Sequence, residues 1–231
     1  MSSDEPNMKK IIIQCSRSKR EDARTFFGQN GKPVKFVAHP ELCDTSQPFI
    51  FCRPDDYLPR SNISWRQYLK SYNRQGTNSA GLSRAADLYK PEIYRLLADL
   101  FGLENTYILS AGWGLVRASF LIPDCDITFS RRAGSSYRRT EIDEYNDFNQ
   151  LLRDGSVSRN DDIYFFGGRD YLPLLYKLTR FLPEKKVVYY QSAEIPREED
   201  LSYEYIRYHT KQRSNWHHAC AMDFIREHEK R

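Results

Sequence analysis

Short apolar runs alternate along the chain with longer stretches in which apolar residues recur at helical spacing. The run at residues 10–14, Lys-Ile-Ile-Ile-Gln, has no polar alternation, which is typical of a strand buried on both faces. Similar runs predict strands at residues 34–38, 106–109, 162–166 and 186–190. The helical pattern predicts a helix at 65–72, with Ser64 as its N-cap, and two short helices within 85–100. Pro91 separates these two helices, and Gly102 ends the second. Further helices are predicted at 169–182, with Pro173 in the first turn, and at 215–229.

The order of these elements predicts the fold class. Strands separated by helices imply right-handed crossovers and a mostly parallel sheet, so we expect a three-layer α/β protein with helices on both faces of the sheet. The 231 residues fit a single domain. Within it we expect a flexible tail at 1–9, a loop-rich insertion at 39–64 with one small strand near 49–51, and a mobile basic loop at 130–140.

Folds of this class bind ligands beyond the carboxyl ends of their strands. The segments that follow the predicted sheet strands are CSRSK at 15–19, SAGWG at 110–114, GGRD at 167–170 and QSAE at 191–194. All of them carry small, hydroxyl, amide or charged residues, so we expect a site built from them. In the first segment Ser16, Ser18 and Lys19 suit a phosphate or carboxylate, whereas Cys15 is expected mainly to pack.

Glycines shape two of the other segments. Around Ser110, Gly112 and Gly114 flank Trp113, which predicts either an indole that projects as a stacking wall or a tight turn with the indole in the core. Gly168 and Arg169 open a helix directly after a strand. That opening resembles an anion-binding helix N-terminus, but it has neither a dinucleotide-binding nor a P-loop motif.

Acid–base candidates lie in two further places. Asp124 and Asp126 follow a proline, and they either orient a water or are ordinary solvated loop acids. His217 follows Asn215 at the start of the last helix, where it is a candidate hydrogen-bond donor to a ligand. Adjacent histidines point about 100° apart on a helix and no second ligand pair has suitable spacing, so we expect no metal.

A basic loop is the candidate contact for a nucleic-acid backbone. Arg131, Arg132, Arg138 and Arg139 frame a Gly-Ser-Ser-Tyr segment, although a solvated surface loop has the same composition. Net charge is only +4, but aromatic residues make up 14% of the chain. Rings interleaved with Arg and Lys suit base stacking and phosphate contacts, so nucleic acid is a candidate partner.

The rest of the composition excludes several classes. No apolar run approaches the ~18–20 residues that span a bilayer, and the first ten residues lack the apolar stretch of a secretory signal. The five cysteines are an odd number without a CxxC pair, which favours reduced thiols. We therefore expect a cytoplasmic protein without a cofactor, whose oligomeric state the sequence does not indicate.

Several short motifs together resemble the YaaA-like proteins of the peroxide-stress type and their bacterial relatives. The motifs are CSRSK after the first strand, Leu88-Tyr89 at a helix start, and ILSAGWGL followed by Pro123-Asp124-x-Asp126. The resemblance spans roughly residues 10–225 and implies DNA binding and protection from oxidative damage. It also implies a uracil-DNA-glycosylase-like fold, related to a domain of tRNA deazaguanine-modifying enzymes, with residues 15–19 in the place of the first glycosylase motif. The chain has no GQDPY-type or HPSP-type segment, so a larger, modified base is expected in place of uracil.

Three hypotheses of function remain at this stage. The first is a metal-independent DNA glycosylase that flips a modified base out of the duplex and hydrolyses its N-glycosidic bond, in DNA repair or phage defence. The second is a non-catalytic DNA-binding protein of the oxidative-stress response. The third is a nucleoside- or ribosyl-transferring enzyme that uses the same pocket.

The first hypothesis assigns roles to particular residues. Trp113 or Tyr89 stacks on the flipped base, and Asp124 or Asp126 positions water or stabilises the oxocarbenium-like sugar. His217 hydrogen-bonds the departing base. Phosphates are held by residues 15–19, by Arg169 and by the loop at 131–139.

Overall fold

The structure, a computed structural model, describes residues 8–153, 161–196 and 203–230, so most of the predicted tail lies outside the described part. Its centre is a mixed, mostly parallel sheet of seven strands in the order β11-β10-β9-β1-β5-β6-β8. Strand β6 pairs antiparallel with β5, and the other neighbouring pairs are parallel. The strands are β1 (Lys9–Gln14), β5 (Thr106–Ser110), β6 (Gly114–Arg117), β8 (Phe148–Asn149), β9 (Asp162–Phe166), β10 (Lys185–Tyr190) and β11 (Glu204–Arg207).

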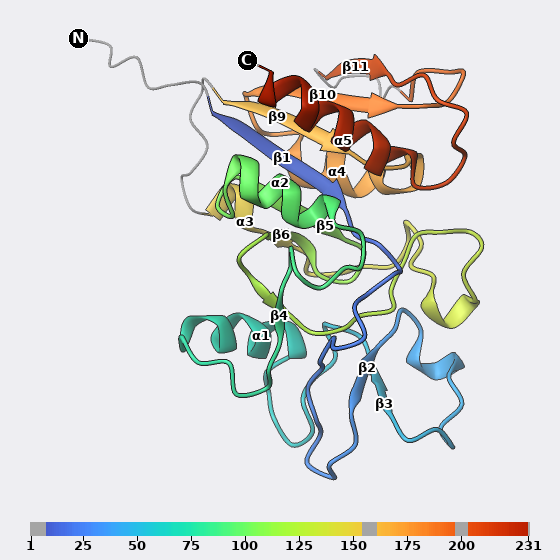
Figure 1. Cartoon of the computed structure of the whole chain (residues 1–231). Helices are drawn as coiled ribbons and strands as arrows, with labels where there is room; N and C mark the ends of the chain where they lie inside the picture. Colours follow the sequence, from blue (N-terminus) through green and yellow to red (C-terminus); the bar gives the residue numbers. More distant parts are fainter. Residues whose placement is uncertain (1–7, 154–160, 197–202, 231) are drawn as a thin grey trace.

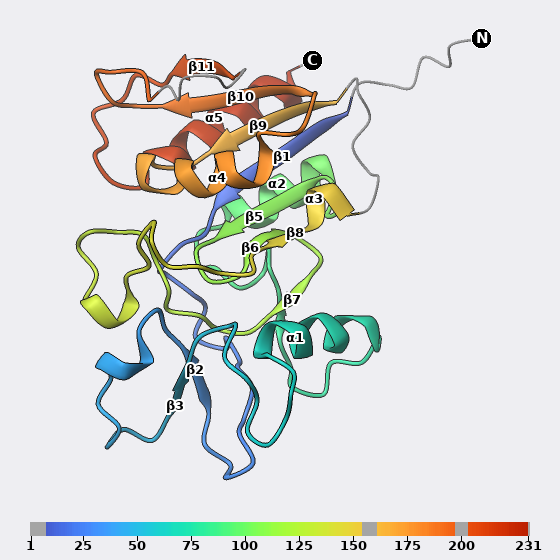
Figure 2. The same ribbon diagram turned by 180° about the vertical axis from the view of Figure 1, so that it is seen from behind.

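Helices cover both faces of this sheet (Figures 1 and 2). Helices α2 (Ile93–Phe101) and α5 (Trp216–Glu229) lie on one face, and α3 (Gln150–Arg153) and α4 (Leu172–Thr179) lie on the other. Strand β1 shows why both faces are covered. Ile11 and Ile13 are buried in the core beneath α2 and α5, while Ile12 is buried in the core beneath α4. The predicted α/β class, with a mostly parallel sheet between helices, is confirmed.

A smaller lobe lies below the sheet in Figure 1. It contains α1 (Trp65–Arg74), the parallel pair β2 (Val34–Phe36) and β3 (Ile50–Cys52), and the antiparallel pair β4 (Ser83–Arg84) and β7 (Leu121–Ile122). Its core is aromatic, with ring centroids 5.9 Å apart for Phe36 and Trp65. The Phe36 ring also lies 4.9 Å from the Trp113 ring, so the core of the lobe continues into that of the sheet.

Local sequence rules account for several element ends. Helix α1 begins at Trp65 as predicted, because Ser64 and Gln67 form a capping box in which each side chain accepts a hydrogen bond from the other residue's backbone N–H. Gly102 ends α2 in a backbone conformation with φ of 89°, which favours glycine. The predicted helix at 169–182 is shorter, since it opens with a 3₁₀ turn at Arg169–Tyr171 and its α-helical part ends at Thr179.

One predicted helix is wrong. Residues 85–90 have helical spacing, but they form turns that pair with the segment after β1. The Arg20 N–H donates to the Leu88 carbonyl over 2.9 Å, and the Lys90 N–H donates to the Ser18 carbonyl over 3.0 Å. These long-range bonds take the place of a helical turn and bring Tyr89 next to Lys19.

Three shorter 3₁₀ helices are also present in the described ranges, at Pro40–Leu42, Ser135–Tyr137 and Arg169–Tyr171. The predicted small strand of the 39–64 insertion is confirmed as β3, one residue later than expected. Across the described ranges, no helix has the length and apolar character that crossing a membrane requires.

Candidate functional site

A cavity of about 360 Å³ lies beyond the carboxyl ends of β1 and β5. The sheet order explains its place. From β1 the chain proceeds to β5 on one side of that strand and later to β9 on the other side, so the strand order reverses at β1. Such a reversal opens a crevice in parallel sheets and is where these folds bind ligands. We call this cavity the Lys19 pocket.

Four sequence segments that are far apart in the chain line the Lys19 pocket. They are the turn after β1, the Leu88-Tyr89 pair, the turn after β5, and the segment at 122–128 that follows β7. Between them they supply Cys15, Ser16, Arg17, Lys19, Leu88, Tyr89, Ser110, Pro123, Cys125 and Asp126. These segments are the ones that contain the YaaA-like motifs.

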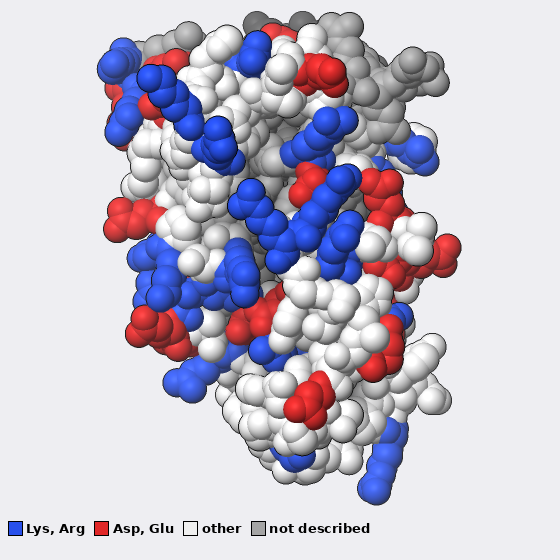
Figure 3. All heavy atoms as spheres, turned by 90° about the vertical axis from the view of Figure 1, so that its right-hand side faces the viewer, with Lys and Arg blue, Asp and Glu red and all other residues white. Residues whose placement is uncertain are grey.

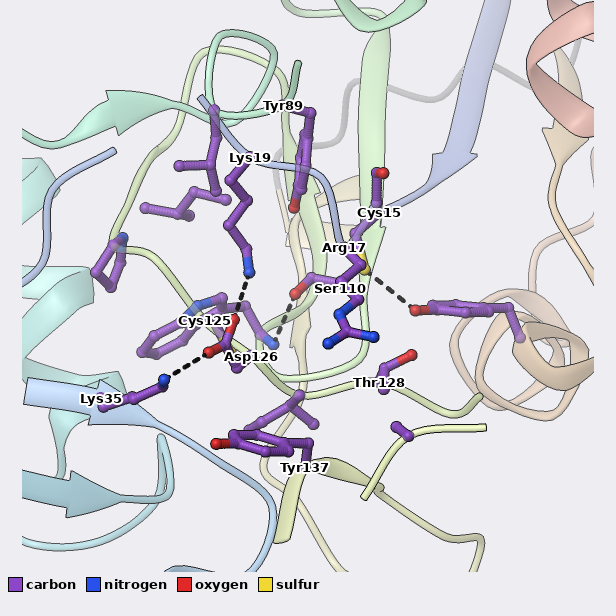
Figure 4. A pocket seen from close by; sticks show the side chains of 18 of the residues that line it. Cys15, Arg17, Lys19, Lys35, Tyr89, Ser110, Cys125, Asp126, Thr128 and Tyr137 are labelled. Atoms are coloured by element: carbon purple, nitrogen blue, oxygen red, sulfur yellow. Dashed lines mark hydrogen bonds and ion pairs between the residues drawn. The ribbon is translucent and has the colours of Figure 1, made fainter. Parts of the chain in front are cut away.

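Lys19 and Asp126 form the charged centre of the pocket. The Lys19 Nζ lies 2.9 Å from Asp126 Oδ1 and 3.0 Å from Asp124 Oδ1, and the Lys35 Nζ reaches Asp126 Oδ2 at 3.2 Å. Figure 4 shows the two lysines approaching Asp126 from different directions. Burial alone would raise the pKa of Asp126, but the two ammonium groups outweigh it and hold that pKa below its usual range. Asp126 is therefore ionised at neutral pH.

The same contacts fix the charge of Lys19. Burial alone would lower the pKa of Lys19, but the carboxylates of Asp124 and Asp126 raise it above its ordinary value. A lysine held as an ammonium ion is no nucleophile, and it serves instead as a fixed cation and hydrogen-bond donor.

Aromatic rings border the charged centre. Tyr89 and Tyr137 lie on opposite sides of Asp126 in Figure 4. Burial raises the pKa of Tyr89, so its phenol keeps its proton and can donate a hydrogen bond. The Lys35 Nζ lies 5.6 Å from the centre of the Tyr137 ring. The pocket therefore combines ring surfaces for a flat ligand with cations for a negative one.

A second cavity, of about 480 Å³, adjoins the first. We call it the His217 pocket. Cys15 and Tyr171 line both cavities, and the Cys15 Sγ lies 3.2 Å from the Tyr171 hydroxyl. The sequence candidates that line only the second cavity are Ser18, Gly168, Arg169, Asn215 and His217.

Burial controls the chemistry of His217. His217 is only 4% exposed. Burial, together with the adjacent His218, lowers the pKa of His217 to about 3. Its Nε2 has no hydrogen-bond partner among the described residues. The ring is therefore neutral at neutral pH, with one nitrogen that a ligand can satisfy.

The structure separates the three candidate catalytic residues. Asp126 lines the Lys19 pocket, whereas His217 lines the adjoining cavity. Asp124 lines neither, because it lies behind Lys19 at a small surface hollow of about 140 Å³. In this arrangement the three side chains do not meet at a single reacting atom.

Trp113 lies in the wall of the Lys19 pocket but does not project into it as a stacking surface. Its indole has no exposed surface and packs between Phe36 and Phe148, with the Arg66 guanidinium 5.5 Å from the ring centre. The alternative interpretation, a tight turn with the indole in the core, is correct. The turn is also tight at Gly112, where a Cβ would lie 2.5 Å from the Cys125 Sγ.

Arg139 is a structural residue and not a surface contact. It is buried, its guanidinium lies 2.8 Å from each Asp147 carboxylate oxygen, and it donates to the Ala111 carbonyl over 2.7 Å. We therefore no longer expect it to contact a nucleic-acid backbone. Of the other loop arginines, Arg132 lines both pockets, whereas Arg131 and Arg138 line neither.

The loop at 130–140 is tied at both ends. The Thr128 N–H donates to the Tyr137 carbonyl, the Arg139 N–H donates to the Thr128 carbonyl, and the His39 N–H donates to the Ser136 carbonyl. Its mobility stays a prediction.

The fourth strand exit does not join the site. Gln191 and its neighbours line neither pocket, and the Gln191 Nε2 donates to the Gln212 carbonyl over 2.6 Å. The reason is the strand order, since β9 lies between β10 and the central strand β1. The expectation that all four exits assemble one site is therefore wrong for this one.

Several residues of the site have no counterpart in the sequence-based expectations. Lys35, Thr128, Tyr137 and Tyr171 line the Lys19 pocket, and Gln14 lines the His217 pocket. Lys35 had a recognisable pattern, because a polar residue between two apolar ones in a strand points to the opposite face. The others are brought to the site by pairing between distant segments.

A metal centre has no visible basis in this site. In the part of the chain that the structure describes, His, Cys, Asp and Glu side chains do not gather in the groups of three that a metal ion would need.

Comparisons with protein-family models, with curated proteins and with solved structures find no match for this chain. The chemistry of the site is therefore argued from its own residues.

Proposed function

We propose that this chain is a metal-independent DNA glycosylase that binds a flipped-out, modified nucleotide in the Lys19 pocket and acts in DNA repair or phage defence. The observation that supports the proposal most is that motifs far apart in the sequence meet at one cavity. The short motifs of the YaaA-like resemblance are separated by up to about a hundred residues, yet they line one cavity at the reversal of the strand order. Enzymes that work on a base must first extrude it from the duplex into such a pocket.

The pocket suits a modified base in size and lining. Its volume of about 360 Å³ lies within the range of small-molecule sites, roughly 300–1,000 Å³. Tyr89 offers a ring surface and a phenol donor, and Lys19 offers an ammonium donor to the edge of the base. Cys125 can only act as a thiol, because burial raises its pKa to about 12.

Asp126 is the residue best placed for the chemical step. In N-glycosidic hydrolysis a water molecule attacks C1′ of the sugar, the bond from C1′ to the base nitrogen breaks, and the base leaves with that electron pair and a proton. Positive charge develops on the sugar in the transition state, and an ionised carboxylate stabilises it or orients the water. Asp126 is ionised, and it lines the cavity that holds the base in this proposal.

The proposal includes the fold. We propose that the sheet is of the uracil-DNA-glycosylase-like type and that the chain is a remote YaaA-like protein. The reversal of strand order at β1, with the turn at 15–19 at its mouth, supports this relationship.

A non-catalytic DNA-binding protein is the second candidate, and two observations favour it. Two lysines already compensate the charge of Asp126, and His217 lines a different cavity from Asp126. In this alternative the same pocket binds a nucleotide without hydrolysing it.

The two candidates differ in a single assay. The purified chain is incubated with duplex DNAs that carry different modified bases, and hot alkali then reveals abasic sites as strand breaks. We expect strand breaks on at least one DNA, their loss in Asp126→Asn, and retention of DNA binding by that variant. The matched control is Asp22→Asn, which removes an exposed carboxylate outside both pockets and should cleave like the native chain.

The opposite outcome is equally clear. Absence of alkali-sensitive sites on every DNA, with salt-sensitive binding retained by the native chain and by Asp126→Asn alike, would replace the glycosylase with the binding protein. An Asp124→Asn variant shows which aspartate matters, since Asp124 lies outside the pocket and its loss should reduce cleavage less than the loss of Asp126.

A further inference from the structure

The His217 pocket has an unusual charge distribution. Arg17, Arg132 and Arg169 line it, and all three are exposed. They come from three separate segments, namely the turn after β1, the loop at 130–140 and the start of the 3₁₀ turn after β9. The lining includes one carboxylate, that of Asp170. The cavity is therefore positive overall.

Among the residues that the structure describes, no carboxylate forms an ion pair with any of these three arginines. Within the described residues, neither Arg17, Arg132 nor Arg169 forms an ion pair, whereas many other arginines of the chain do. Like charges repel, so three unpaired guanidinium groups around one cavity are most stable when an anion lies between them. In Figure 1, β1 and β9 run toward the right-hand side of the molecule. Figure 3 faces that side, and Lys and Arg side chains gather over its middle.

Neutral groups complete the lining. Hydroxyls of Ser16, Ser18 and Thr128 line the cavity, and the buried ring of His217 lies beside them with its Nε2 unpartnered among the described residues. A buried polar atom without a partner costs stability that a ligand hydrogen bond restores. Guanidinium groups with several hydroxyl and N–H donors match the oxygens of a phosphate group.

The two pockets are placed to hold one ligand. Cys15, Ser16, Arg17 and Thr128 line both cavities, so a molecule can pass from one to the other along this shared wall. To this shared wall the Lys19 pocket adds the Tyr89 ring and the ionised Asp126, whereas the His217 pocket adds Arg169 and the Ser18 hydroxyl. A nucleotide divides its chemistry in the same way, into a flat base and an anionic phosphate.

We infer that the His217 pocket is a phosphate subsite, and that its phosphate belongs to the nucleotide whose base occupies the Lys19 pocket. The second half of this inference rests on the proposed function, but the first half does not. It assigns a phosphate-bearing nucleotide or strand as the ligand, in preference to a free base or nucleoside.

Calorimetric titration at low salt tests the phosphate subsite directly. The probes are inorganic pyrophosphate, thymidine and thymidine 3′,5′-bisphosphate. We expect the bisphosphate to bind at least about tenfold more tightly than thymidine, because charge-assisted hydrogen bonds are the strong ones. Histidine NMR signals of His217 should shift when pyrophosphate is added.

Two arginine variants supply the matched comparison. Arg169→Gln removes a cation that lines only the His217 pocket, and it should weaken pyrophosphate and bisphosphate binding about fivefold to tenfold without changing thymidine binding. Arg180→Gln removes an equally exposed charge at the end of α4 that lines neither pocket, and it should bind all probes like the native chain. Both positions are exposed, so neither change threatens folding.

The results separate this inference from the proposed function. Equal affinity for thymidine and its bisphosphate, or equal losses in Arg169→Gln and Arg180→Gln, would overturn the phosphate subsite even if the chain cleaves modified DNA. A preference for phosphate that depends on Arg169 would support the subsite even if no DNA is cleaved. If pyrophosphate binds but the bisphosphate binds no more tightly than pyrophosphate alone, the subsite stands and the shared-ligand half of the inference fails.

Discussion

Two adjacent histidines at the start of α5 are held neutral by the fold. Burial, with a contribution from His218, lowers the pKa of His217 to about 3, and burial lowers the pKa of His218 to about 4. The His218 ring is fixed by its Nε2, which lies 3.3 Å from the Tyr94 hydroxyl. In the unfolded chain both rings regain the ordinary histidine pKa of about 6.5. The two states therefore bind different numbers of protons in mildly acidic solution.

This difference predicts a loss of stability in acid. Above about pH 6.5 neither state protonates these rings, so the free energy of unfolding has its full value. As the pH falls toward about 4, the unfolded chain takes up protons that the folded chain excludes, and stability drops by up to about 1.4 kcal/mol per pH unit for each histidine. Urea unfolding at about pH 7 and about pH 5 measures the slope.

Glutamine variants assign that slope to these rings. In the double variant His217→Gln, His218→Gln the free energy of unfolding should change less between the two pH values than in the native chain. His209→Gln, at an exposed histidine, should keep the native slope. A double variant with the native pH dependence would show that other groups cause the loss.

At the scale of elements, two buried arginines, one from α1 of the small lobe and one from the loop at 130–140, clamp the turn after β5. Arg66 of α1 donates to the carbonyls of Gly112 and Trp113 over 2.8 and 2.9 Å, and Arg139 donates to that of Ala111 over 2.7 Å. Each guanidinium is itself held by a carboxylate, from Asp55 and Asp147 respectively. Three consecutive carbonyls of the turn after β5 are thus satisfied by side chains from distant segments.

Removal of one arginine should therefore be costly. Arg139→Met leaves the carboxylate of Asp147, which is 1% exposed, without its bidentate partner, although Lys177 still lies 3.0 Å away. Breaking such a buried pair costs about 3–5 kcal/mol of unfolding free energy. Arg138→Met is the matched neighbour and should cost under about 1 kcal/mol, because its side chain forms no ion pair in the described residues. Chemical denaturation compares the two variants, and similar stabilities would refute the clamp.

The clamp also shows what the sequence could and could not predict. Strands such as β1 and β9 were predicted because a buried β-branched or aromatic run has few other structures available. Strands β6, β8 and β11 have two to four residues and no period of their own, so they are strands only through pairing with neighbours. The burial of Arg66 and Arg139 depends on partners that are distant in sequence or in other elements, and a single sequence does not reveal such pairs.

The site was predicted to a similar extent. The rule that ligands bind beyond strand ends predicted that residues 15–19, 110–114 and 167–170 lie near one another, and each of these segments lines at least one of the two pockets. The rule failed for the segment after β10, because the order of the strands within the sheet does not follow from their order along the chain. The roles of Lys35 and Tyr137 were missed because their segments reach the pocket through the small lobe and its loops.

At the scale of the whole molecule, the position of the charges matters more than their sum. A net charge of +4 is unremarkable for 231 residues. Some exposed cations are balanced locally, as Lys90 is by Glu21 and Arg226 by Asp223. Arg17, Arg132 and Arg169 have no ion pair in the described chain, and they converge on one cavity, so their positive potentials add there.

This distribution predicts how binding of single-stranded DNA responds to salt. Each phosphate contact releases counterions, so log K falls with log salt concentration by about 0.7 per contact on a single strand. Contacts from Arg17, Arg132 and Arg169 give a slope of about −2, and Arg169→Gln should reduce its magnitude by about 0.7. Fluorescence anisotropy with a labelled oligonucleotide over a salt series measures both slopes. If net charge alone governed binding, Arg180→Gln would change the slope as much as Arg169→Gln, because the two substitutions remove the same charge from exposed positions. A slope that changes only with Arg169 therefore locates the strand at the His217 pocket, whereas equal changes would leave a diffuse basic surface as the explanation.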